Sequence, residues 1–496
     1  MKKVFLSIFL MLCSVVLLAQ KEVKVIETNF KGSGFNNKES LAISNKNTGE
    51  LVILVEDSKY TKLYLFDTNF KLKAELKTDR LQKNFKSFVG YSIDNDVYSI
   101  VFTDNKIKRF GILSFNFKTK TLNQDELVVD FEKEKYIKSL THNDTFYIIT
   151  ASKKSEKVHF YSLSNDKTFK KKTIPFDHFV FANDQNYKKY PVDLFRSVGW
   201  FGSGSIVRID SNSPNSIENT SSKNKLYQTK NELIFTTDVL KGETRIIKVD
   251  MNDFSVTSSS FEKPVIFPTE PGFPVSYKHN SFIHNGILYQ LSINSKEMKF
   301  VAIGLDSKTK LKEINLKKED SITFKNGPII QEGGSSFQSA RIRKLEKTSK
   351  FLRKVGNSDV GITAYKKSDT LQLTIGGYIV VQSSGAPILV GGGGAIGGAI
   401  SGAAFALSSA FNPTFGAYGA YSSTKSTYID CKFDKDFKHI EGDRLENAFD
   451  KIKIFEDNFV ENYFSNNKNI KKEDQFGKIT PRMKLKNVFY HNNKYI

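Results

Sequence analysis

The chain has 496 residues, whereas one ordinary domain has about 100–200 residues. It therefore forms either two domains or one large repeat architecture. Its 39% hydrophobic and 26% charged residues exclude a wholly disordered chain and a polytopic membrane protein. The net charge is +21, but only ten of the 74 basic residues are Arg. The Lys ammonium is a solvated point charge, whereas the planar guanidinium of Arg is the group that forms paired hydrogen bonds with bases and phosphates. A diffuse basic surface is therefore favoured over a nucleic-acid-binding groove.

The first residues predict export. Two lysines precede an apolar stretch from Val4 to Leu18, and Ala19 offers a cleavage site before Gln20. An N-terminal membrane anchor is the alternative, but the apolar run is shorter than the about 18–20 residues that a spanning helix needs. We therefore expect residues 1–19 to be a signal peptide that directs the protein to the periplasm, the outer envelope or the medium.

Cysteine usage indicates a protein without disulfides. Cys13 lies within the signal, so Cys431 is the one thiol expected in the mature chain. A single cysteine excludes an internal disulfide and a Cys-rich zinc site. The sequence implies no metal and no cofactor.

Alternating apolar and polar residues, typical of β-strands, dominate the chain. Clear pairs such as Leu51–Val55 with Lys62–Phe66 are separated by polar turns, and similar stretches recur in six units, at approximately 40–80, 88–127, 136–177, 224–263, 280–320 and 358–443. About four short strands in 40–50 residues is the spacing of a β-propeller blade. We expect an all-β protein that forms a six- or seven-bladed β-propeller over residues 20–443. Two tandem sandwiches would explain the strands equally well but not the recurring spacing.

Several units share a turn with Asp in its second position. The four examples are Phe66-Asp67-Thr68-Asn69, Val249-Asp250-Met251-Asn252, Leu305-Asp306-Ser307-Lys308 and Phe433-Asp434-Lys435-Asp436. Beyond them, residues 444–496 predict a helix and a closing strand. The helix is indicated by apolar residues at three- and four-residue steps, namely Leu445, Ala448, Phe449, Ile452, Phe455, Phe459 and Tyr463. This stripe is more typical of core packing than of a cofactor site.

A first departure from the repeat runs from Phe179 to Asn224. It holds the one tryptophan, Trp200, among glycines, with Asp193 and Arg196 before it. An aromatic ring near charges can stack on a sugar or an apolar ligand, so these three residues form a candidate ligand-binding site. The alternative is an irregular blade in which Trp200 belongs to the core.

A second departure is the stretch 370–424, which contains no charged residue and is rich in glycine around Ile388–Phe411. Small residues four apart permit close helix approach in lipid, and the run is long enough to span a bilayer. Glycine at this density also disfavours a helix, which favours a flexible loop inserted between two strands of one blade. A surface loop, a membrane-contacting segment and a self-association segment all remain open.

The densest positive charge lies in Ala340–Gly356, where apolar residues fall approximately on one face of a helix. A basic amphipathic helix can lie on an anionic membrane, whereas such helices more often pack on the protein body with their charges in solvent. The candidate residues for surface or membrane contact are Arg341, Arg343, Lys344, Lys347, Arg353 and Lys354.

Local catalytic motifs are absent. The sequence has no zinc-protease motif, nucleophile elbow, phosphate-binding loop or EF-hand. His279 and His284 are five residues apart and give a weak metal signal, and the neighbours Asp177 and His178 point to opposite faces of a strand. The catalytic residues, if any, are unknown from the sequence.

The repeat spacing of residues 40–443 resembles that of β-propeller proteins in general. With its short lysine-led signal and Lys- and Asn-rich strands, the whole chain resembles the uncharacterised exported proteins of Gram-negative bacteria, and no specific enzyme family. The resemblance implies an exported binding or scaffold protein that presents propeller loops to an unknown protein, a glycan or an envelope surface, with possible membrane attachment through the Gly-rich insertion. The alternative is a secreted hydrolase or lyase with a carboxylate site at the propeller centre.

Overall fold

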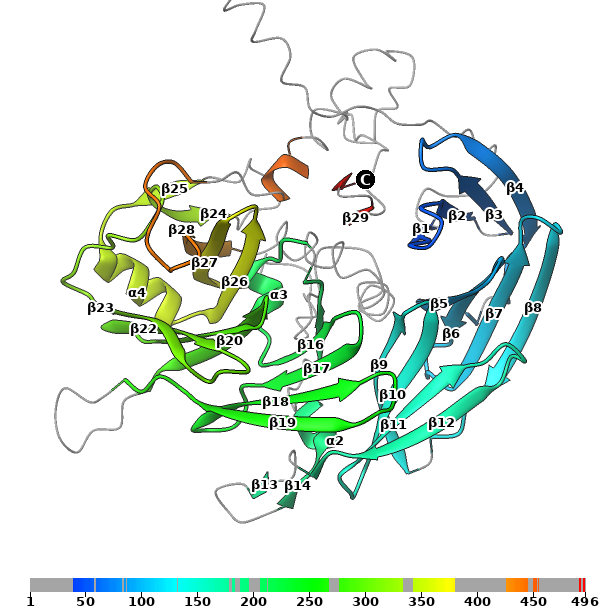
Figure 1. The fold of residues 1–496 in the computed structure, drawn as a ribbon, viewed down its shortest axis with the longest axis horizontal. Coiled ribbons are helices and arrows are strands. Elements are labelled where there is room, and N and C mark those ends of the chain that lie inside the picture. Colours follow the sequence, from blue (N-terminus) through cyan, green and yellow to red (C-terminus); the bar gives the residue numbers. More distant parts are fainter. Residues whose placement is uncertain are drawn as a thin grey trace, which may run out of the picture. The chain divides into compact units, whose positions relative to one another are not determined.

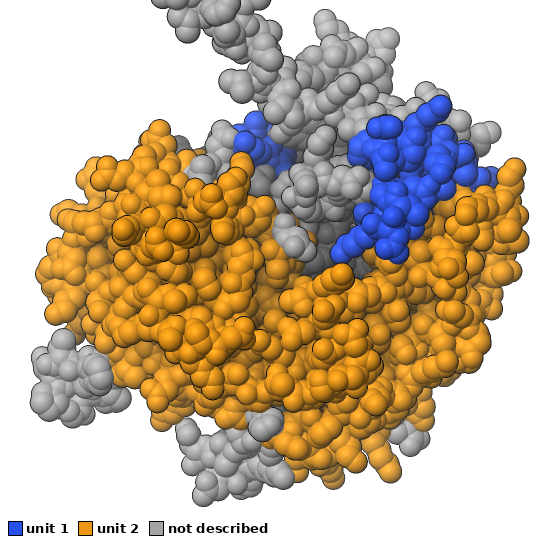
Figure 2. Space-filling model, viewed as in Figure 1, with its two compact units in different colours: residues 1–80, 450–487 blue, residues 81–449, 488–496 orange. Residues whose placement is uncertain are grey.

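The structure is a computed structural model that describes residues 39–379, 425–454, 490–491 and 494–495, apart from gaps at 178–180, 183–187, 196–205, 267–275, 333–341 and 445–448 and at a few single positions. These residues divide into two compact units, residues 1–80 with 450–487 and residues 81–449 with 488–496. Figure 2 distinguishes the two units by colour. The signal peptide predicted for residues 1–19 and most of the Gly-rich insertion lie outside the described residues.

The first unit contains one described sheet. It is an antiparallel meander of four strands in chain order, β1 (Glu39–Ser44), β2 (Leu51–Glu56), β3 (Tyr60–Phe66) and β4 (Leu72–Asp79). Its limits match the first unit expected from the repeat, because alternating apolar residues such as Leu54 and Leu63 are fully buried while the outermost strand β4 is mostly exposed.

The second unit contains five sheets of four or five strands among its described residues (Figure 1). Three of them are four-stranded antiparallel meanders, each ordered as in the chain. The first consists of β5 (Ser87–Asp94), β6 (Val97–Thr103), β7 (Arg109–Asn116) and β8 (Thr121–Val128). The second consists of β9 (Glu134–His142), β10 (Thr145–Ser152), β11 (Lys157–Leu163) and β12 (Phe169–Pro175). The third consists of β20 (Lys278–His284), β21 (Ile287–Ile293), β22 (Glu297–Gly304) and β23 (Lys310–Lys317).

The region 179–224, where the sequence shows little strand pattern, holds short elements. They are β13 (Phe181–Ala182), β14 (Lys188–Lys189), α2 (Pro191–Phe195), β15 (Val207–Ile209) and α3 (Ile217–Thr220). β15 runs parallel to β16 (Asn224–Gln228) and adds a fifth strand to the meander that continues through β17 (Glu232–Thr237), β18 (Glu243–Asp250) and β19 (Val256–Glu262).

The last sheet of the second unit does not follow chain order. Its order is β25 (Arg343–Leu345), β24 (Ile329–Glu332), β28 (Lys425–Phe433), β27 (Thr370–Ile379) and β26 (Asp359–Lys367). The charge-free stretch thus begins as β27, which pairs with β28 as the sequence indicates, and 380–424 lie outside the described residues. Two-residue strands β29 (Tyr490–His491) and β30 (Lys494–Tyr495) pair near the C-terminus.

A single helix over 340–356 is not what the structure shows. Arg343–Leu345 pairs with β24 as a strand, and helix α4 covers Thr348–Gly356. Farther along, Phe449–Ile452 and Ile454 are helical, while the rest of the predicted C-terminal helix and the closing strand lie mostly outside the described residues. Among the described residues, no helix has the length and apolar character needed to cross a membrane.

Sheets of the second unit are buried on both faces. Along β10, Ile148 belongs to a core shared with β5–β8, whereas Ile149 belongs to a core shared with β15–β19. Leu226 and Tyr227 of β16 divide in the same way between the cores on either side. Because successive residues of a strand point to opposite faces, a sheet packed between two neighbours has apolar residues on both. The all-β prediction is confirmed.

Polar side chains also join neighbouring sheets. The Thr141 hydroxyl of β9 donates to the Tyr91 carbonyl of β5 at 2.6 Å and accepts from the Tyr91 N–H at 2.9 Å. Gln228 Nε2 donates to the Thr141 carbonyl at 2.9 Å, and the Ile283 N–H donates to the Tyr227 hydroxyl at 3.1 Å. These bonds lie at the first long strand of each sheet and fix how consecutive sheets stack.

Candidate functional site

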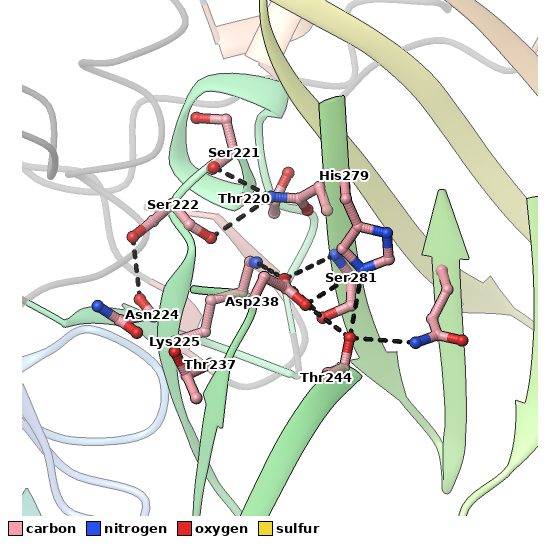
Figure 3. Close-up of polar contacts among 12 residues, drawn as sticks. Thr220, Ser221, Ser222, Asn224, Lys225, Thr237, Asp238, Thr244, His279 and Ser281 are labelled. Atoms are coloured by element: carbon pink, nitrogen blue, oxygen red, sulfur yellow. Dashed lines mark hydrogen bonds and ion pairs between the residues drawn. The ribbon is translucent and has the colours of Figure 1, made fainter. Parts of the chain in front are cut away.

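A cluster of ionisable side chains lies between the sheets β15–β19 and β20–β23 (Figure 3). The carboxylate of Asp238, just after β17, accepts hydrogen bonds from the Thr244 hydroxyl at 2.7 Å and from the Ser281 hydroxyl and N–H at 2.8 and 2.9 Å. Lys225 Nζ lies 3.6 Å from Asp238 Oδ2, and His279 Nε2 lies 3.3 Å from Oδ1. The cluster therefore joins two sheets through one acid.

Burial sets the protonation of this cluster. Burial opposes ionisation of Asp238, but the hydrogen bonds and the positive charge of Lys225 outweigh it and hold the Asp238 pKa well below its usual range. Burial lowers the pKa of Lys225 to about 8, although Asp238 opposes the shift, and burial also lowers the pKa of His279. The side chains of Lys225 and Asp238 are 0% exposed, so no substrate reaches them. The acid, imidazole and hydroxyl groups are arranged for structural support.

A second buried acid, Glu134, repeats this arrangement within the sheet β9–β12. It accepts hydrogen bonds from Thr150 Oγ1, from the Tyr161 hydroxyl at 2.9 Å and from Lys171 Nζ. His159 Nε2 lies 3.6 Å from Glu134 Oε1. Glu218 and Glu332 likewise accept from hydroxyl groups, those of Ser426 and Tyr428. These buried carboxylates act as hydrogen-bond acceptors inside and between sheets, as buried charges must.

A different set of groups lies on the first strands of three consecutive sheets. We call Tyr91 of β5, Lys138 of β9 and Arg208 of β15 the inner-strand cation site. Arg208 is near enough for its positive charge to act on both: it contributes to the lowered pKa of Lys138 and opposes the rise in the pKa of Tyr91. Lys138 is 7% exposed, and within the described residues its ammonium has no hydrogen bond or ion pair. The side chains of Tyr91 and Arg208 retain partial exposure.

The electrostatics of this site favour an anion. Burial, followed by the positive charge of Arg208, lowers the pKa of Lys138 to about 8. Burial also lowers the pKa of Arg208, while Asp210 and Tyr91 oppose that shift. Burial raises the pKa of Tyr91 to about 12, with a contribution from the negative charge of Asp144. Near neutral pH the site therefore holds one guanidinium, a lysine that exchanges protons readily, and a protonated phenol.

The backbone beside Tyr91 is positioned by close packing. A Cβ on the preceding Gly90 would lie 2.5 Å from the ring of Phe146, which is fully buried. A residue without a side chain is therefore needed at position 90. The two hydrogen bonds between the Thr141 hydroxyl and the backbone of Tyr91 then fix the position of Tyr91. On β9, Tyr136 donates to or accepts from Ser139 Oγ at 2.9 Å beside Lys138. Sheet packing thus holds the site in place.

The ligand-binding residues predicted from the sequence are described only in part. Asp193 is exposed on α2, and its carboxylate accepts from the Tyr190 N–H at 2.9 Å at the start of that helix. Arg196 and Trp200 lie outside the described residues, so their grouping with Asp193 stays a prediction. Of the predicted contact residues, Arg341 also lies outside, while Arg343 and Lys344 are on β25 and Arg353 and Lys354 on α4.

The scattered histidines have separate partners. His279 Nδ1 lies 3.1 Å from the Ser292 hydroxyl, and His284 Nε2 accepts from the Lys366 N–H at 3.1 Å. They do not form a common metal site, and within the described part of the chain no group of three or more His, Cys, Asp or Glu could hold a metal ion. Cys431 is buried, and burial raises the pKa of its thiol well above the usual value.

Sequence reasoning missed Lys138 and Arg208, which belong to no motif. Each is a cation with apolar residues close to it in its strand. Lys138 alternates with Tyr136 and Leu140, and Arg208 stands between Val207 and Ile209. A charged residue at an apolar position of a strand was the available signal.

No family model matches the chain, and no curated protein matches it. Solved structures with some similarity include an ACO/RPE65 chimera (10% identity, 54% of this chain and 58% of that chain, TM-score 0.26) and the cobalt-substituted Synechocystis apocarotenoid oxygenase (10%, 57% and 61%, 0.26). Another is the dihydro-heme d1 dehydrogenase NirN (10%, 73% and 74%, 0.25). The match spans about three fifths of the length of the oxygenase structures.

These structures correct the function predicted from the sequence. They are named as enzymes, an oxygenase and a dehydrogenase, whereas the sequence led us to expect an exported binding or scaffold protein. Similarity at this level of identity and TM-score transfers no activity, substrate or metal to the present chain.

Proposed function

We propose that the chain is an exported lyase that acts on a carboxylate-bearing substrate, with acidic glycans as the first class to examine, at the inner-strand cation site. The observation that carries the proposal is Lys138, a nearly buried lysine without a described partner, next to Arg208. A general base works best when its pKa is near the operating pH, and burial gives Lys138 a pKa of about 8.

The groups at the site suit a β-elimination. Arg208 pairs with the substrate carboxylate and stabilises the negative charge that develops beside it. Neutral Lys138 takes the proton from the carbon next to the carboxylate, and the electron pair of that bond forms a carbon–carbon double bond as the bond to the leaving oxygen breaks. The phenol of Tyr91, protonated because its pKa is about 12, gives the leaving oxygen a proton. Hydrolysis by a pair of carboxylates is less favoured, since Glu134 and Asp238 are engaged by hydrogen bonds.

We also propose that the six sheets are the blades of one β-propeller, as the repeat predicts. In its support, each unit of the sequence repeat corresponds to a sheet, and sheets of the second unit have both faces buried. Export through the signal peptide of residues 1–19 belongs to the same proposal, because acidic polysaccharides occur outside the cytoplasm. The basic composition of the chain favours an anionic substrate.

The test is the activity of purified protein on acidic glycans such as polygalacturonate, alginate and hyaluronan, with neutral dextran and simple esters for comparison. A lyase produces an unsaturated uronate, which is followed by ultraviolet absorbance. We expect K138M to lower kcat/KM at least about 100-fold. The matched control is K133M, which removes an exposed lysine from the segment before the same strand.

The pH dependence adds a second readout. Since Lys138 must be neutral to take a proton, kcat/KM should rise with pH and level off above about 8. Unsaturated product formed equally by K138M and the parent would refute the role of Lys138. Absence of product from every acidic glycan would refute the lyase.

A further inference from the structure

Seven basic side chains gather around helix α4. They come from the edge strand β25, from the helix and the residue before it, and from the start of β28, and they are Arg343, Lys344, Lys347, Lys350, Arg353, Lys354 and Lys425. We call this group the basic face.

The members of the basic face are neighbours for two reasons. Helix α4 packs on β28, which begins with Lys425. Strand β25, which carries Arg343 and Lys344, ends at Leu345, shortly before α4 begins at Thr348.

The packing of α4 fixes which side of the helix faces outward. Phe351, Leu352 and Val355 are 0% exposed and belong to the main core of the second unit. Lys350 and Arg353 lie on the opposite, exposed side of the same helix. Because the apolar side is occupied by the core, the helix presents only its basic side to a partner.

The positive charges of the basic face are close enough to repel one another. The pKa of Lys354 is lowered by partial burial and then by the charges of Lys425, Arg353, Arg343 and Lys350. Within the described residues, no member of the face forms an ion pair with an acid. Between 342 and 356 the sequence has one acid, Glu346, and its side chain is exposed. An external anion bound at the face would therefore relieve this repulsion.

The chemistry of the face indicates what kind of anion binds. Five of the seven cations are Lys, which acts as a point charge and suits a diffuse anionic surface better than a ligand that needs bidentate recognition. Beside them, the apolar side chain of Ile342 is 59% exposed. Cations next to an exposed apolar side chain are typical of a contact with the headgroup region of a bilayer.

We propose that the basic face binds the surface of an anionic phospholipid bilayer, with its ammonium and guanidinium groups at the headgroup phosphates and Ile342 at the boundary with the acyl chains. The attachment is peripheral, since the apolar side of α4 stays in the core. It is independent of the lyase activity, because Lys138 and Arg208 are not part of this face.

The test uses the purified full chain and sedimentation with phosphatidylcholine vesicles that contain or lack phosphatidylglycerol. We expect binding only to the anionic vesicles, and weaker binding as salt is added. Each basic residue near an anionic surface contributes about 1 kcal/mol, so the triple variant K350Q/R353Q/K354Q should lose about 100-fold in partitioning.

The matched control is K154Q/K157Q/K170Q, which removes the same charge from exposed lysines of the sheet β9–β12. This control should bind within a few-fold of the parent. Equal binding by the two triple variants would overturn the proposal, because binding would then follow net charge alone. Binding to soluble polyphosphate but not to anionic vesicles would also overturn it, since the face would then recognise a free polyanion.

Discussion

His284 lies on β20, where its Nε2 accepts a hydrogen bond from the Lys366 N–H at 3.1 Å. Only the neutral ring can accept this bond. Burial, and then the positive charge of Lys366, lowers the pKa of His284 to about 4. The unfolded chain therefore binds a proton at a higher pH than the folded protein does, and this group makes the free energy of unfolding fall as the pH drops from about 6.5 to about 4.

We predict that H284Q reduces this acid sensitivity. The glutamine side chain keeps an acceptor for the Lys366 N–H but does not titrate. Between pH 7 and pH 4.5 the parent should lose about 2 kcal/mol more than H284Q, measured by urea unfolding at each pH. His159 and His279 also have lowered pKa values because of burial, so the variant keeps part of the slope. Identical slopes for the two proteins would show that His284 does not titrate on unfolding.

Lys138 and Arg208 illustrate what residue-level reading leaves out. The sequence indicates that both lie in strands, but the strands that carry them, β9 and β15, are 65 or more residues apart in the chain. Their proximity depends on how sheets stack, which the alternating pattern does not specify. The burial that lowers the pKa of Lys138 is likewise a property of the packed sheets.

At the scale of elements, the recurring Asp turn has a clear physical basis. Asp434 Oδ1 accepts from the N–H groups of Asp436 and Lys438 at 2.9 and 2.8 Å, and Phe437 adopts a φ of 57°. Asp67 makes the corresponding bonds to Asn69 and Lys71. A short acidic side chain that accepts from the N–H groups two and four residues ahead stabilises the turn before a strand returns.

We predict that D434A lowers the free energy of unfolding by about 1 kcal/mol, because two N–H groups lose their acceptor. Asp306 provides the control. Its side chain is 90% exposed and contacts Lys248, while the turn there is built on Ser307, whose hydroxyl accepts from the Thr309 N–H. D306A should change stability by less than about 0.5 kcal/mol, measured by urea unfolding. Equal losses in the two variants would contradict the role given to the Asp434 carboxylate.

Regular strands were predictable, and short elements were not. The spans expected at 40–80, 88–127 and 280–320 agree closely with β1–β4, β5–β8 and β20–β23, because long alternating strands bury one residue in two. β13, β14 and β15 have only two or three residues each, too few to show a period. Arg343–Leu345 fits a helical pattern but pairs with β24, since pairing in a sheet can outweigh local propensity.

Three of the outermost strands are rich in lysine. Lys73 and Lys77 lie on β4, Lys170, Lys171 and Lys172 on β12, and Lys310, Lys312 and Lys317 on β23. Such edge strands have unpaired N–H and C=O groups that could pair with another chain, and lysine on an edge opposes this. The lysines of these three strands thus oppose the association of sheets through their edges.

At the scale of the whole second unit, stability depends on buried hydrogen bonds and ion pairs between sheets as well as on apolar cores. Asp238 is the acceptor for groups from both sheets that it joins. We predict that D238N lowers the free energy of unfolding by about 3–5 kcal/mol, because it leaves Lys225 buried beside a neutral amide. The measurement is the midpoint of urea unfolding at pH 7.

The control for this prediction is K225M. In that variant Asp238 keeps the donors Thr244, Ser281 and His279, so the loss should be smaller than in D238N, and the double variant should recover part of the loss. If D238N lowered the free energy of unfolding by less than about 1 kcal/mol, the contacts of Asp238 would contribute little to holding the two sheets together.

The unusual strand order of the last sheet has a consequence for assembly. Most of the described sheets join strands that are neighbours in the chain and can form soon after those strands are synthesised. β24 instead pairs with β28, as in the pair Gln331 and Thr427, which are 96 residues apart. Closing so long a loop costs entropy before any pairing offsets it. We therefore expect this sheet to be the last to assemble, and until β28 pairs with it the edge of β24 is open to chaperones and proteases.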